Sequence, residues 1–461
     1  MPLILPGNVG SATAATGFNV DNSCRFDRAS SDDFTKSSSG GSRRKATFSA
    51  WLKWGIHVGT STEQGIFESH DGTNYFSVYT DGKNLRANNT GGTGDAIYST
   101  QVLRDPSAWY HVVIAVDSDQ GTASNRFRMY INGSEVTSFS AAVYPTENED
   151  MKFNGSGTIQ VGGGAAGNWD GYMAEVVWID GSQLAPDQFG EFDSDSGIWK
   201  PIDVSGLTFG TNGFYLDFKD SANLGNDANG GTDLGENNIV ANNQSIDTCT
   251  NNFCTMNPLY PDGTITFSEG NLKLTEGNSW RSAGGTMAVS TGKWFWEVSN
   301  VGNYAYIGFA DIQLFSEGCS IRESFTTGAA TTGRAHSVLN SDGRHYQVTS
   351  GGAQSSEYPS DATFPTFTNS IISIALNLDD NNFIFYKDGT AMNPSGNAIS
   401  ITAGTYIPAV SIYGNTVSYN FGSPSYSESG GNSDGNGYGN FSMAVPSGYF
   451  ALNTKNLAEY G

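Results

Sequence analysis

Apolar and polar residues alternate along several short stretches in the first third of the chain. In 46–54 (ATFSAWLKW) every even position is apolar, and the odd positions carry Thr47, Ser49, Trp51 and Lys53. The stretches 109–117 (WYHVVIAVD) and 125–133 (NRFRMYING) show the same period, with the polar SDQGTAS between them. Period-two alternation of this length predicts half-buried strands in antiparallel sheets, and the last two stretches are typical of a hairpin.

A second set of strands repeats this plan. In 370–380 (SIISIALNLDD) Ile372, Ile374, Leu376 and Leu378 share a face, and the turn DDNN returns the chain as FIFYKDG. Short apolar runs separated by Gly, Asn, Asp and Ser recur along the chain, which is typical of strands joined by turns. We therefore predict an all-β fold of two antiparallel β-sandwich (jelly-roll) domains joined by a long irregular connector.

These patterns divide the chain into four segments. We expect an N-terminal attachment segment at 1–19, a first sandwich at 20–190, a connector at 191–262, and a second sandwich at 263–461 with a Gly/Ser-rich C-terminal extension. The connector is rich in Asn and Gly and contains one clear strand, NGFYLDF. A segment of this length without regular structure is expected to wrap the surface of a neighbouring domain or to serve in assembly.

Three adjacent aromatic residues in TGKWFWEVS (291–299) raise the question of a ligand platform. By parity, Trp294 and Trp296 share one face of a strand, and Phe295 lies on the other face between Lys293 and Glu297. Burying two tryptophans against an opposite sheet stabilises a sandwich by a few kcal/mol each. We therefore predict a core strand, with Phe295 beneath a loop or at an interface.

Charge limits the classes of partner. The chain has 46 acidic and 23 basic residues and a net charge of −23, which argues against nucleic acid or an anionic membrane as a partner. No apolar run reaches a membrane-spanning length, so we expect no membrane insertion. The first 20 residues contain no basic residue and only a four-residue apolar stretch, which is not the pattern of a secretory signal.

Four cysteines are too few for a disulfide framework in a chain of 461 residues. Cys249 and Cys254 lie close together in TCTNNFCT, and two interpretations stay open: a local disulfide, or two half-buried thiols. No histidine lies at ligand spacing from them, so a zinc site is not expected. The composition of 425–440 (SYSESGGNSDGNGYGN) is typical of mobile segments, and order there would indicate contacts within a larger assembly or within the chain.

The strand motifs together resemble two known modules in order. FSAWLKW, WYHVVIAVD, FRMYINGSEV and WDGYMAEVVWIDGSQLAPDQFGEFD are similar to the strands of a laminin-G-like (concanavalin-like) jelly roll. GKWFWEVS, YIGFAD, ISIALNLDDNNFIFYKDG and YIPAVSIYGNTVSYNFG are similar to the strands of a SPRY domain. The joining segment from NGFYLDF to TNNFCTMNPL and the ending PSGYFALNTKNL resemble the same two-module arrangement in structural proteins of tailed bacteriophages.

This resemblance implies a virion protein, most often a tail fibre or a related appendage, assembled in the host cytoplasm. It implies other virion proteins as partners, a host-surface glycan or protein as receptor, and a homotrimer as the usual form. The apolar stretch PLILP is the candidate attachment contact, and it consists of Pro2, Leu3, Ile4, Leu5 and Pro6. The alternatives are an architectural head-fibre, decoration or tail-assembly protein and a glycan-cleaving tailspike.

Laminin-G-like domains often hold calcium at the rim of the sandwich, but this sequence assigns no ligand set. Asp71, Asp81 and Asp170 lie in loop-like stretches, although Asp beside Gly is commonly just a turn residue. Calcium needs six or more oxygen ligands, so we expect no resident cofactor and leave calcium as an unassigned option.

No motif indicates catalysis. The five histidines are scattered without a metal-binding pattern, and there is no nucleophile elbow or phosphate-binding loop. A glycan-cleaving enzyme would need a carboxylate pair about 5–10 Å apart, but most acidic residues lie in turn contexts. We expect a protein that is not an enzyme.

Aromatic residues in predicted loops are the candidates for ligand binding, because rigid sandwiches usually display function on loops. A ring beside Asp or Asn suits a sugar, whose C–H face stacks while its hydroxyls form hydrogen bonds. The candidates are Trp169, Asp170 and Tyr172 in NWDGY, His70 and Tyr75 in ESHDGTNYF, and His345 and Tyr346 in DGRHYQ. For Trp169 packing in the core or at the rim is the competing interpretation, and His111 is expected to be a structural residue within its strand.

Overall fold

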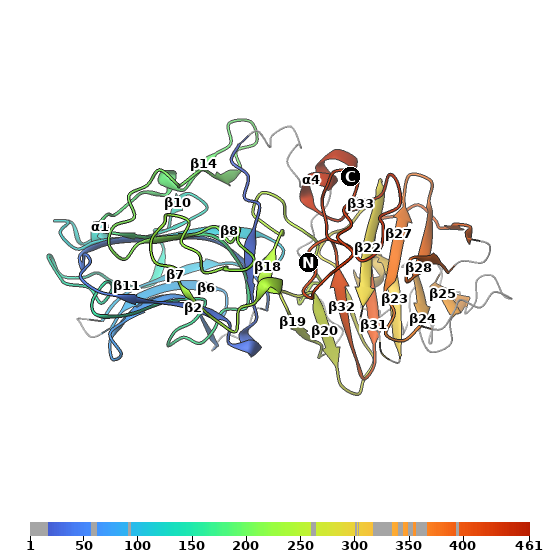
Figure 1. Cartoon of the computed structure of the whole chain (residues 1–461), viewed down its shortest axis with the longest axis horizontal. Helices are drawn as coiled ribbons and strands as arrows, with labels where there is room; N and C mark the ends of the chain where they lie inside the picture. Colours follow the sequence, from blue (N-terminus) through green and yellow to red (C-terminus); the bar gives the residue numbers. More distant parts are fainter. Residues whose placement is uncertain are drawn as a thin grey trace. The chain divides into compact units, whose positions relative to one another are not determined.

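The computed structural model describes most of the chain. The described residues are 17–56, 62–90, 94–259, 264–299, 302, 304–316, 334–339, 344–348, 354–355, 367–392 and 396–461. They form two compact units, with the boundary between Thr250 and Asn251. Figure 1 colours the first unit from blue to green and the second from yellow to red. The fold is all-β, as predicted, and its main sheets are antiparallel.

The first unit is a sandwich of two eight-stranded sheets. Sheet A has the order β10-β9-β8-β3-β13-β1-β18, with β16 paired to β13; sheet B has the order β11-β7-β6-β5-β4-β12-β2-β17. The strands of sheet A are β1 Ser23–Phe26, β3 Lys45–Trp54, β8 Trp109–Asp117, β9 Phe127–Ile131, β10 Ser134–Glu135, β13 Gly171–Asp180, β16 Phe214–Leu216 and β18 Gln244–Ser245. The strands of sheet B are β2 Asp33–Ser38, β4 Glu63–His70, β5 Tyr75–Asp81, β6 Asn84–Asn89, β7 Asp95–Val102, β11 Phe139–Val143, β12 Gly157–Val161 and β17 Gly235–Asn237.

The remaining elements of this unit are short. They are the hairpin of β14 Gly190–Phe192 and β15 Trp199–Pro201, the one-turn helix α1 Ala123–Arg126, and the 3-10 turns η3 Arg28–Ser30, η4 Pro186–Gln188 and η5 Ala241–Asn243. The predicted hairpin of β8 and β9 is confirmed by their antiparallel pairing.

The even-numbered face of β3 forms the core of the first sandwich. Phe48, Leu52 and Trp54 are fully buried in one cluster with side chains of sheet B, including Phe67 and Phe76. Phe48 and Phe67 lie with ring centroids 4.9 Å apart. Alternation therefore predicted correctly which face packs between the sheets.

The prediction that these strands are half-buried is wrong. On the opposite face of β3, Thr47, Ser49 and Lys53 are also buried, each at most 1% exposed. Residues after β13 cover this face: Phe189, Val204, Phe209 and Tyr215 pack in one apolar cluster with side chains of β8 and β13. A later part of the chain thus buries the polar residues on this face. Alternation within a strand cannot predict this, because it depends on residues outside the strand.

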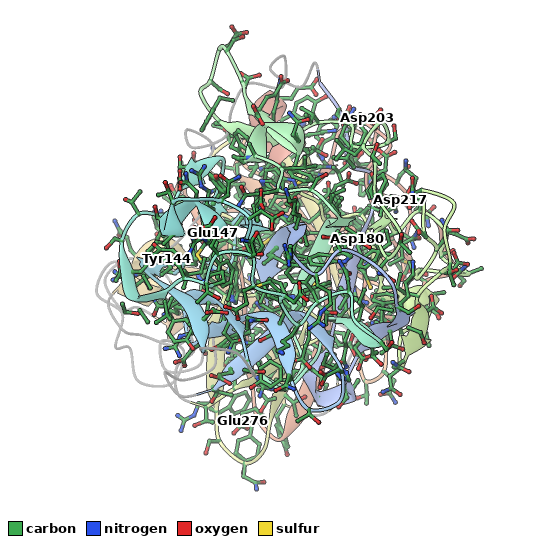
Figure 2. The ribbon with its side chains drawn as sticks, turned by 90° about the vertical axis from the view of Figure 1, so that its left-hand side faces the viewer. Tyr144, Glu147, Asp180, Asp203, Asp217 and Glu276 are labelled. Atoms are coloured by element: carbon green, nitrogen blue, oxygen red, sulfur yellow. The ribbon has the colours of Figure 1, made fainter. Side chains whose placement is uncertain are left out.

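The segment predicted to be an irregular connector contributes this cover, which fits the expectation that it wraps a neighbouring domain. It contains more than the one predicted strand, since β15, β16, β17 and β18 lie within it and three of them extend the two main sheets. At the end of β13, the buried carboxylate of Asp180 accepts hydrogen bonds from the backbone and side-chain nitrogens of Asn212 at 3.0 and 3.1 Å. Figure 2 labels Asp180 together with Asp203 and Asp217 of this segment. The four predicted segment boundaries stay a prediction.

The second unit is also a sandwich. Sheet C has the order β19-β20-β32-β22-β27-β28-β29, with β30 paired to β28 and β33 to β22; sheet D has the order β21-β31-β23-β24-β25-β26. The strands of sheet C are β19 Thr266–Ser268, β20 Lys273–Glu276, β22 Lys293–Ser299, β27 Ile372–Asn377, β28 Asn382–Lys387, β29 Thr390–Ala391, β30 Ile399–Ser400, β32 Asn415–Asn420 and β33 Phe450–Ala451. Sheet D consists of β21 Arg281–Gly284, β23 Ala305–Asp311, β24 Ala335–Leu339, β25 Arg344–Val348, β26 Gln354–Ser355 and β31 Tyr406–Ile412. Among the described residues of this unit, α2 Ile312–Ser316 and α4 Thr454–Tyr460 are helical.

The aromatic strand β22 lies in the core, as predicted. Trp294 and Trp296 are fully buried, and Phe295 packs edge-on against Phe441 at 5.2 Å. Phe441 belongs to the C-terminal extension, so Phe295 does lie beneath a later segment. The predicted hairpin of β27 and β28 is confirmed by their pairing.

The low-complexity stretch 425–440 is held by contacts within the chain. The carboxylate of Asp434 accepts four hydrogen bonds of 2.8–2.9 Å, from the backbone nitrogens of Asn436, Tyr438 and Ala451 and from the side-chain amide of Asn456. Of the two explanations for order in this stretch, the internal one is therefore sufficient.

Two further observations concern the cysteines and the length of the helices. Cys249 and Cys254 are free thiols, so no local disulfide joins them. Within the described residues, no helix is both long and apolar enough to cross a membrane.

Candidate binding site

The structure places one group of predicted ligand-binding residues in the interior. Trp169 is fully buried and packs edge-on against Trp54 at 5.1 Å, and Tyr172 is 1% exposed beneath the ammonium of Lys53. Asp170 is 4% exposed and accepts a hydrogen bond from the backbone of Ile56 at 3.1 Å. Burial raises the pKa of Asp170 to about 7. Rim or core packing, the competing interpretation of Trp169, is what the structure shows.

His70 and Tyr75 face each other across the turn between β4 and β5, and both are half-buried. Nδ1 of His70 accepts a hydrogen bond from the backbone of Gly72, and Asp71 accepts from Thr73 and Asn74. The local turn therefore uses one ring nitrogen of His70 and the carboxylate of Asp71.

His345 and Tyr346 are neighbours on β25 and point to opposite faces of sheet D. His345 was predicted to lie in a loop, but it lies within a strand, is 1% exposed and stacks on His336 at 5.7 Å. Tyr346 is half-buried and packs edge-on against Tyr306 at 5.3 Å. The attachment residues Pro2, Leu3, Ile4, Leu5 and Pro6 lie outside the described residues.

The three aspartates considered for calcium do not come together. Asp71 and Asp81 lie at opposite ends of β5, a separation of about 20 Å for a strand of this length. Asp81 forms an ion pair with Arg86. In the described part of the chain, no cluster of three or more His, Cys, Asp or Glu side chains is arranged to hold a metal ion.

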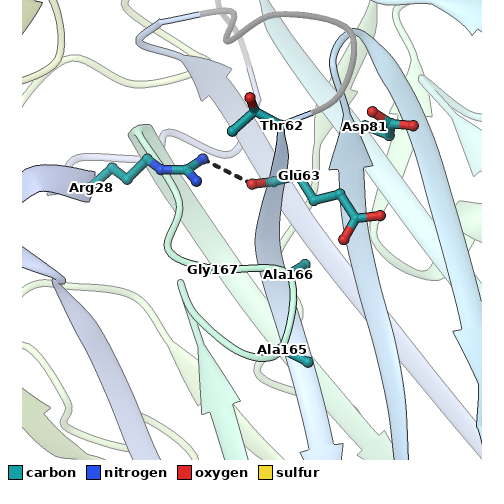
Figure 3. Close-up of a pocket in the computed structure, with 7 residues that line it drawn as sticks. All are labelled: Arg28, Thr62, Glu63, Asp81, Ala165, Ala166 and Gly167. Carbon is teal, nitrogen blue, oxygen red and sulfur yellow. Dashed lines mark hydrogen bonds between the residues drawn. The ribbon is translucent and has the colours of Figure 1, made fainter.

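An open hollow of about 600 Å³ lies at one rim of the first sandwich (Figure 3). Its charged side chains are Arg28 from η3, Glu63 at the start of β4 and Asp81 at the end of β5. The remaining lining residues are Thr62, Ala165, Ala166 and Gly167. Figure 3 shows the carboxylates of Glu63 and Asp81 on the same side of the loop 165–167.

Close packing of β4 against the loop after β12 builds this hollow. Gly65 donates its N–H to the carbonyl of Gly167 at 3.0 Å, and a Cβ on Gly65 would lie 2.6 Å from that oxygen. Only glycine allows this approach. The carboxylate of Glu68 accepts a hydrogen bond from the backbone of Ala165 at 2.8 Å, and burial raises the pKa of this carboxyl.

Arg28 connects the turn η3 to the first residue of β4 at the edge of the hollow. Its guanidinium donates to the backbone carbonyl of Glu63 at 2.8 Å, which leaves the Glu63 carboxylate out of that contact (Figure 3). The next residue of β4, Gln64, accepts a hydrogen bond from the backbone N–H of the buried Asp170 at 2.9 Å. The hollow therefore presents a cationic donor from a 3-10 turn and two carboxylates from strands, one of which is already paired with Arg86, and this set can bind hydroxyl groups.

Sequence reasoning missed Arg28 and Glu63 and considered Asp81 only for calcium. The residues come from three stretches far apart in the sequence and meet through the antiparallel pairing of β4 with β5 and with β12. The glycine-rich run GGGAAGN (162–168) was the available signal, because glycine is needed where two backbones approach closely.

One family model matches a stretch of the first unit that contains the lining residues of the hollow except Arg28. Residues 29–187 match the laminin-G family model described as the Concanavalin A-like lectin/glucanases superfamily. The first unit thus contains a laminin-G-like, concanavalin-like domain, as the sequence resemblance implied. No curated protein sequence matches the chain.

Three solved structures illustrate the range of similar folds. The SPRY domain of human HERC1 is 16% identical, with 36% of this chain and 96% of that chain covered and a TM-score of 0.27. A heptameric SAP-like pentraxin from Limulus polyphemus is 16% identical, with 37% and 82% covered and a TM-score of 0.28. Domains LG4-5 of the mouse laminin alpha1 chain are 10% identical, with 88% of each chain covered and a TM-score of 0.30. At these TM-scores none of the three bears on function.

Proposed function

We propose that the chain is a binding protein that recognises a glycan in the hollow of its first sandwich. The observation that supports this most is the convergence of Arg28, Glu63 and Asp81 at one rim of a sandwich whose family model is described as the Concanavalin A-like lectin/glucanases superfamily. Charged donors and acceptors on a rigid scaffold can fix the orientation of sugar hydroxyls, while Ala165 and Ala166 offer an apolar wall.

The proposal is tested by printing bacterial and animal glycans on an array and incubating it with the full chain. We expect the double variant Glu63→Gln/Asp81→Asn to lose binding at least tenfold, because both acceptors lose their charge without a change in size. The matched control is Glu147→Gln/Asp150→Asn, which removes two exposed carboxylates that also pair with arginines. Equal binding by both double variants would refute a glycan site in the hollow.

We further propose that this recognition serves a tailed bacteriophage, in which the chain is a tail-fibre-like appendage, forms a homotrimer and contacts a host-surface glycan or protein. The support is the sequence resemblance of the two modules and their joining segment, with residues 2–6 as the contact to another virion protein. The test is whether purified full chain blocks phage adsorption to host cells. Failure to block would remove the proposed host recognition without affecting a glycan site measured on the array.

An architectural role is the second candidate. Phe192 and Ile198 on the hairpin of β14 and β15 are 55% and 53% exposed, which suits contact with another protein. A particle that assembles but loses this chain after Phe192→Ser/Ile198→Ser would favour that role. Binding without catalysis is our proposal in either case, and it predicts no new reducing ends when the protein is incubated with host polysaccharide.

A further inference from the structure

A cluster of aromatic side chains lies at one end of sheet D in the second unit, and it includes none of the residues of the proposed glycan site. Ile412 of β31 pairs with Arg281 of β21 and with Ala305 of β23. The next residue outward on each of these three strands is aromatic, and these residues are Trp280, Tyr413 and Tyr304. We call these three residues the aromatic corner.

The rings of the corner stand at an angle to one another. The centroids of Tyr304 and Tyr413 are 6.1 Å apart with an interplanar angle of 89°, and Trp280 lies 5.7 Å from Tyr413 at 39°. Tyr304 is 50% and Tyr413 37% exposed, whereas most aromatic residues of this unit are buried. The exposed rings of Tyr304 and Tyr413 therefore meet nearly at right angles at the surface of this unit.

The backbone of Tyr304 is in the left-handed region, with φ of 64°. A bulky residue in this region is strained by about 1–3 kcal/mol, and glycine or asparagine would adopt it more easily. The backbone N–H of Tyr413 donates to the carbonyl of Tyr304 at 3.1 Å and holds this conformation. Because an aromatic ring is placed where the backbone disfavours it, the ring itself is the feature that needs an explanation.

Glu276 fixes the two turns that carry the corner. Its carboxylate accepts hydrogen bonds from the backbone of Ser279 at 2.9 Å and from Gly414 at 3.1 Å. These residues are the immediate neighbours of Trp280 and Tyr413. Glu276 is 9% exposed and is labelled in Figure 2. The corner is therefore held in place before any ligand binds, which lowers the entropic cost of binding.

Buried hydroxyl groups lie beside the corner on the same face of sheet D. Ser282 pairs with Ser411, which in turn pairs with Tyr306. Both serine side chains are fully buried, and within the described residues their hydroxyls have no hydrogen-bond partner. A buried hydroxyl without a partner costs about 1–3 kcal/mol, and because these two hydroxyls are fully buried, a ligand at the corner does not contact them.

We propose that the aromatic corner is a second carbohydrate-binding site, which takes a pyranose ring with one face of C–H groups, as in gluco- and galacto-configured sugars. The ring stacks on one aromatic face while its hydroxyls reach the phenol groups. A protein partner fits less well, because two half-exposed rings offer on the order of 200 Å² and a stable protein interface needs about 800 Å² per partner. This site does not depend on the hollow of the first unit.

The test uses the full chain on an array of gluco- and galacto-configured oligosaccharides. We expect some oligosaccharides on the array to be bound by the hollow variant Glu63→Gln/Asp81→Asn as by the wild type. Binding of the full chain to these oligosaccharides should fall at least tenfold in Tyr413→Ala. Tyr413→Phe retains the ring and is expected to keep most of the binding. Phe192→Ala, an exposed ring in the other unit, is the matched control and should bind as the wild type does.

Tyr304→Gly separates a binding role from a structural one. Glycine relieves the left-handed strain, so the melting temperature should stay the same or rise while binding to those oligosaccharides falls at least tenfold. The proposal is overturned if no oligosaccharide on the array stays bound by the hollow variant, or if Tyr413→Ala and Tyr304→Gly bind these oligosaccharides as tightly as the wild type. If only the oligosaccharides that need Glu63 and Asp81 lose binding in the hollow variant, that result concerns the site in the hollow, and the proposal for the aromatic corner is supported by the oligosaccharides that remain bound.

Discussion

The indole N–H of Trp199 donates a hydrogen bond to Nδ1 of His111 at 3.0 Å. Since Nδ1 accepts, the proton of the neutral imidazole lies on Nε2, which faces the hydroxyl of Ser49 at 2.9 Å. His111 belongs to β8 in the middle of sheet A, and Trp199 to β15 in the segment that follows the sandwich. This contact ties that segment to the sheet and buries an imidazole between them.

The first prediction concerns the response of this contact to acid. Burial lowers the pKa of His111 to about 3, whereas the unfolded chain binds a proton near pH 6.5. The unfolded state then binds more protons as the pH falls from 6.5 towards 3, so stability is full above pH 6.5 and is lost progressively below it. Between pH 6.5 and 5.0 the loss should be about 2 kcal/mol.

Urea unfolding at pH 7.5 and pH 5.0 measures this loss. His111→Gln removes the titrating group. The free energy of unfolding of this variant should therefore fall by about 2 kcal/mol less than that of the wild type between the two pH values. The same pH dependence in both proteins would show that His111 does not contribute to it.

A buried ion pair offers the second prediction. Nζ of Lys53 lies 2.6 Å from a carboxylate oxygen of Asp247, and both side chains are at most 2% exposed. Trp109 donates to the other oxygen at 3.1 Å. Lys53→Met leaves a buried carboxylate without its cation and should destabilise the first unit by about 3–5 kcal/mol in calorimetry or urea unfolding.

The double variant Lys53→Met/Asp247→Asn should recover most of this loss, because the amide still accepts from Trp109 and no charge remains buried. A double variant as unstable as Lys53→Met alone would contradict this assignment of the cost to the uncompensated charge.

The third prediction concerns the C-terminal extension. Asp434→Ala removes the acceptor of four hydrogen bonds and should free residues 430–440. We expect faster hydrogen exchange at the amides of Asn436 and Tyr438 and earlier protease cleavage in this stretch. Ser429→Ala, an exposed change in the same extension, is the control and should leave both rates unchanged.

The fourth prediction concerns the wall of the hollow. A Cβ on Gly65 would lie 2.6 Å from the carbonyl oxygen of Gly167, so Gly65→Ala should push the loop 165–167 away from β4. We expect weaker glycan binding together with a lower melting temperature of the first unit. Gly72→Ala is a useful comparison, because it lies in an exposed turn with open space around it and should affect stability without affecting binding.

Much of the fold was predictable from the sequence. The alternation in 46–54 and 109–117 identified β3 and β8 and their inward faces, and parity placed Trp294 and Trp296 in the core. These predictions succeeded because side chains of a strand alternate between its two faces whatever the rest of the chain does.

The outward faces and the candidate site were not predictable in the same way. Ser49 and His111 look like solvent-facing residues by alternation, and only the return of a segment containing Trp199 buries them. Arg28 lies in a 3-10 turn and reaches Glu63, 35 residues later in the sequence, through a side-chain hydrogen bond that no local pattern predicts. Trp169 and Tyr172 were candidates because aromatic residues beside Asp suit a sugar, but the same apolar rings also favour the core.

Hydrogen exchange of the full chain tests the central claim most directly, with and without the array glycan that the hollow variant fails to bind. Glycan recognition in the hollow predicts slower exchange at the amides of Glu63, Ala165 and Gly167, and no change at these amides in Glu63→Gln/Asp81→Asn. Unchanged exchange at these three amides in the wild type with the glycan bound would contradict the proposal.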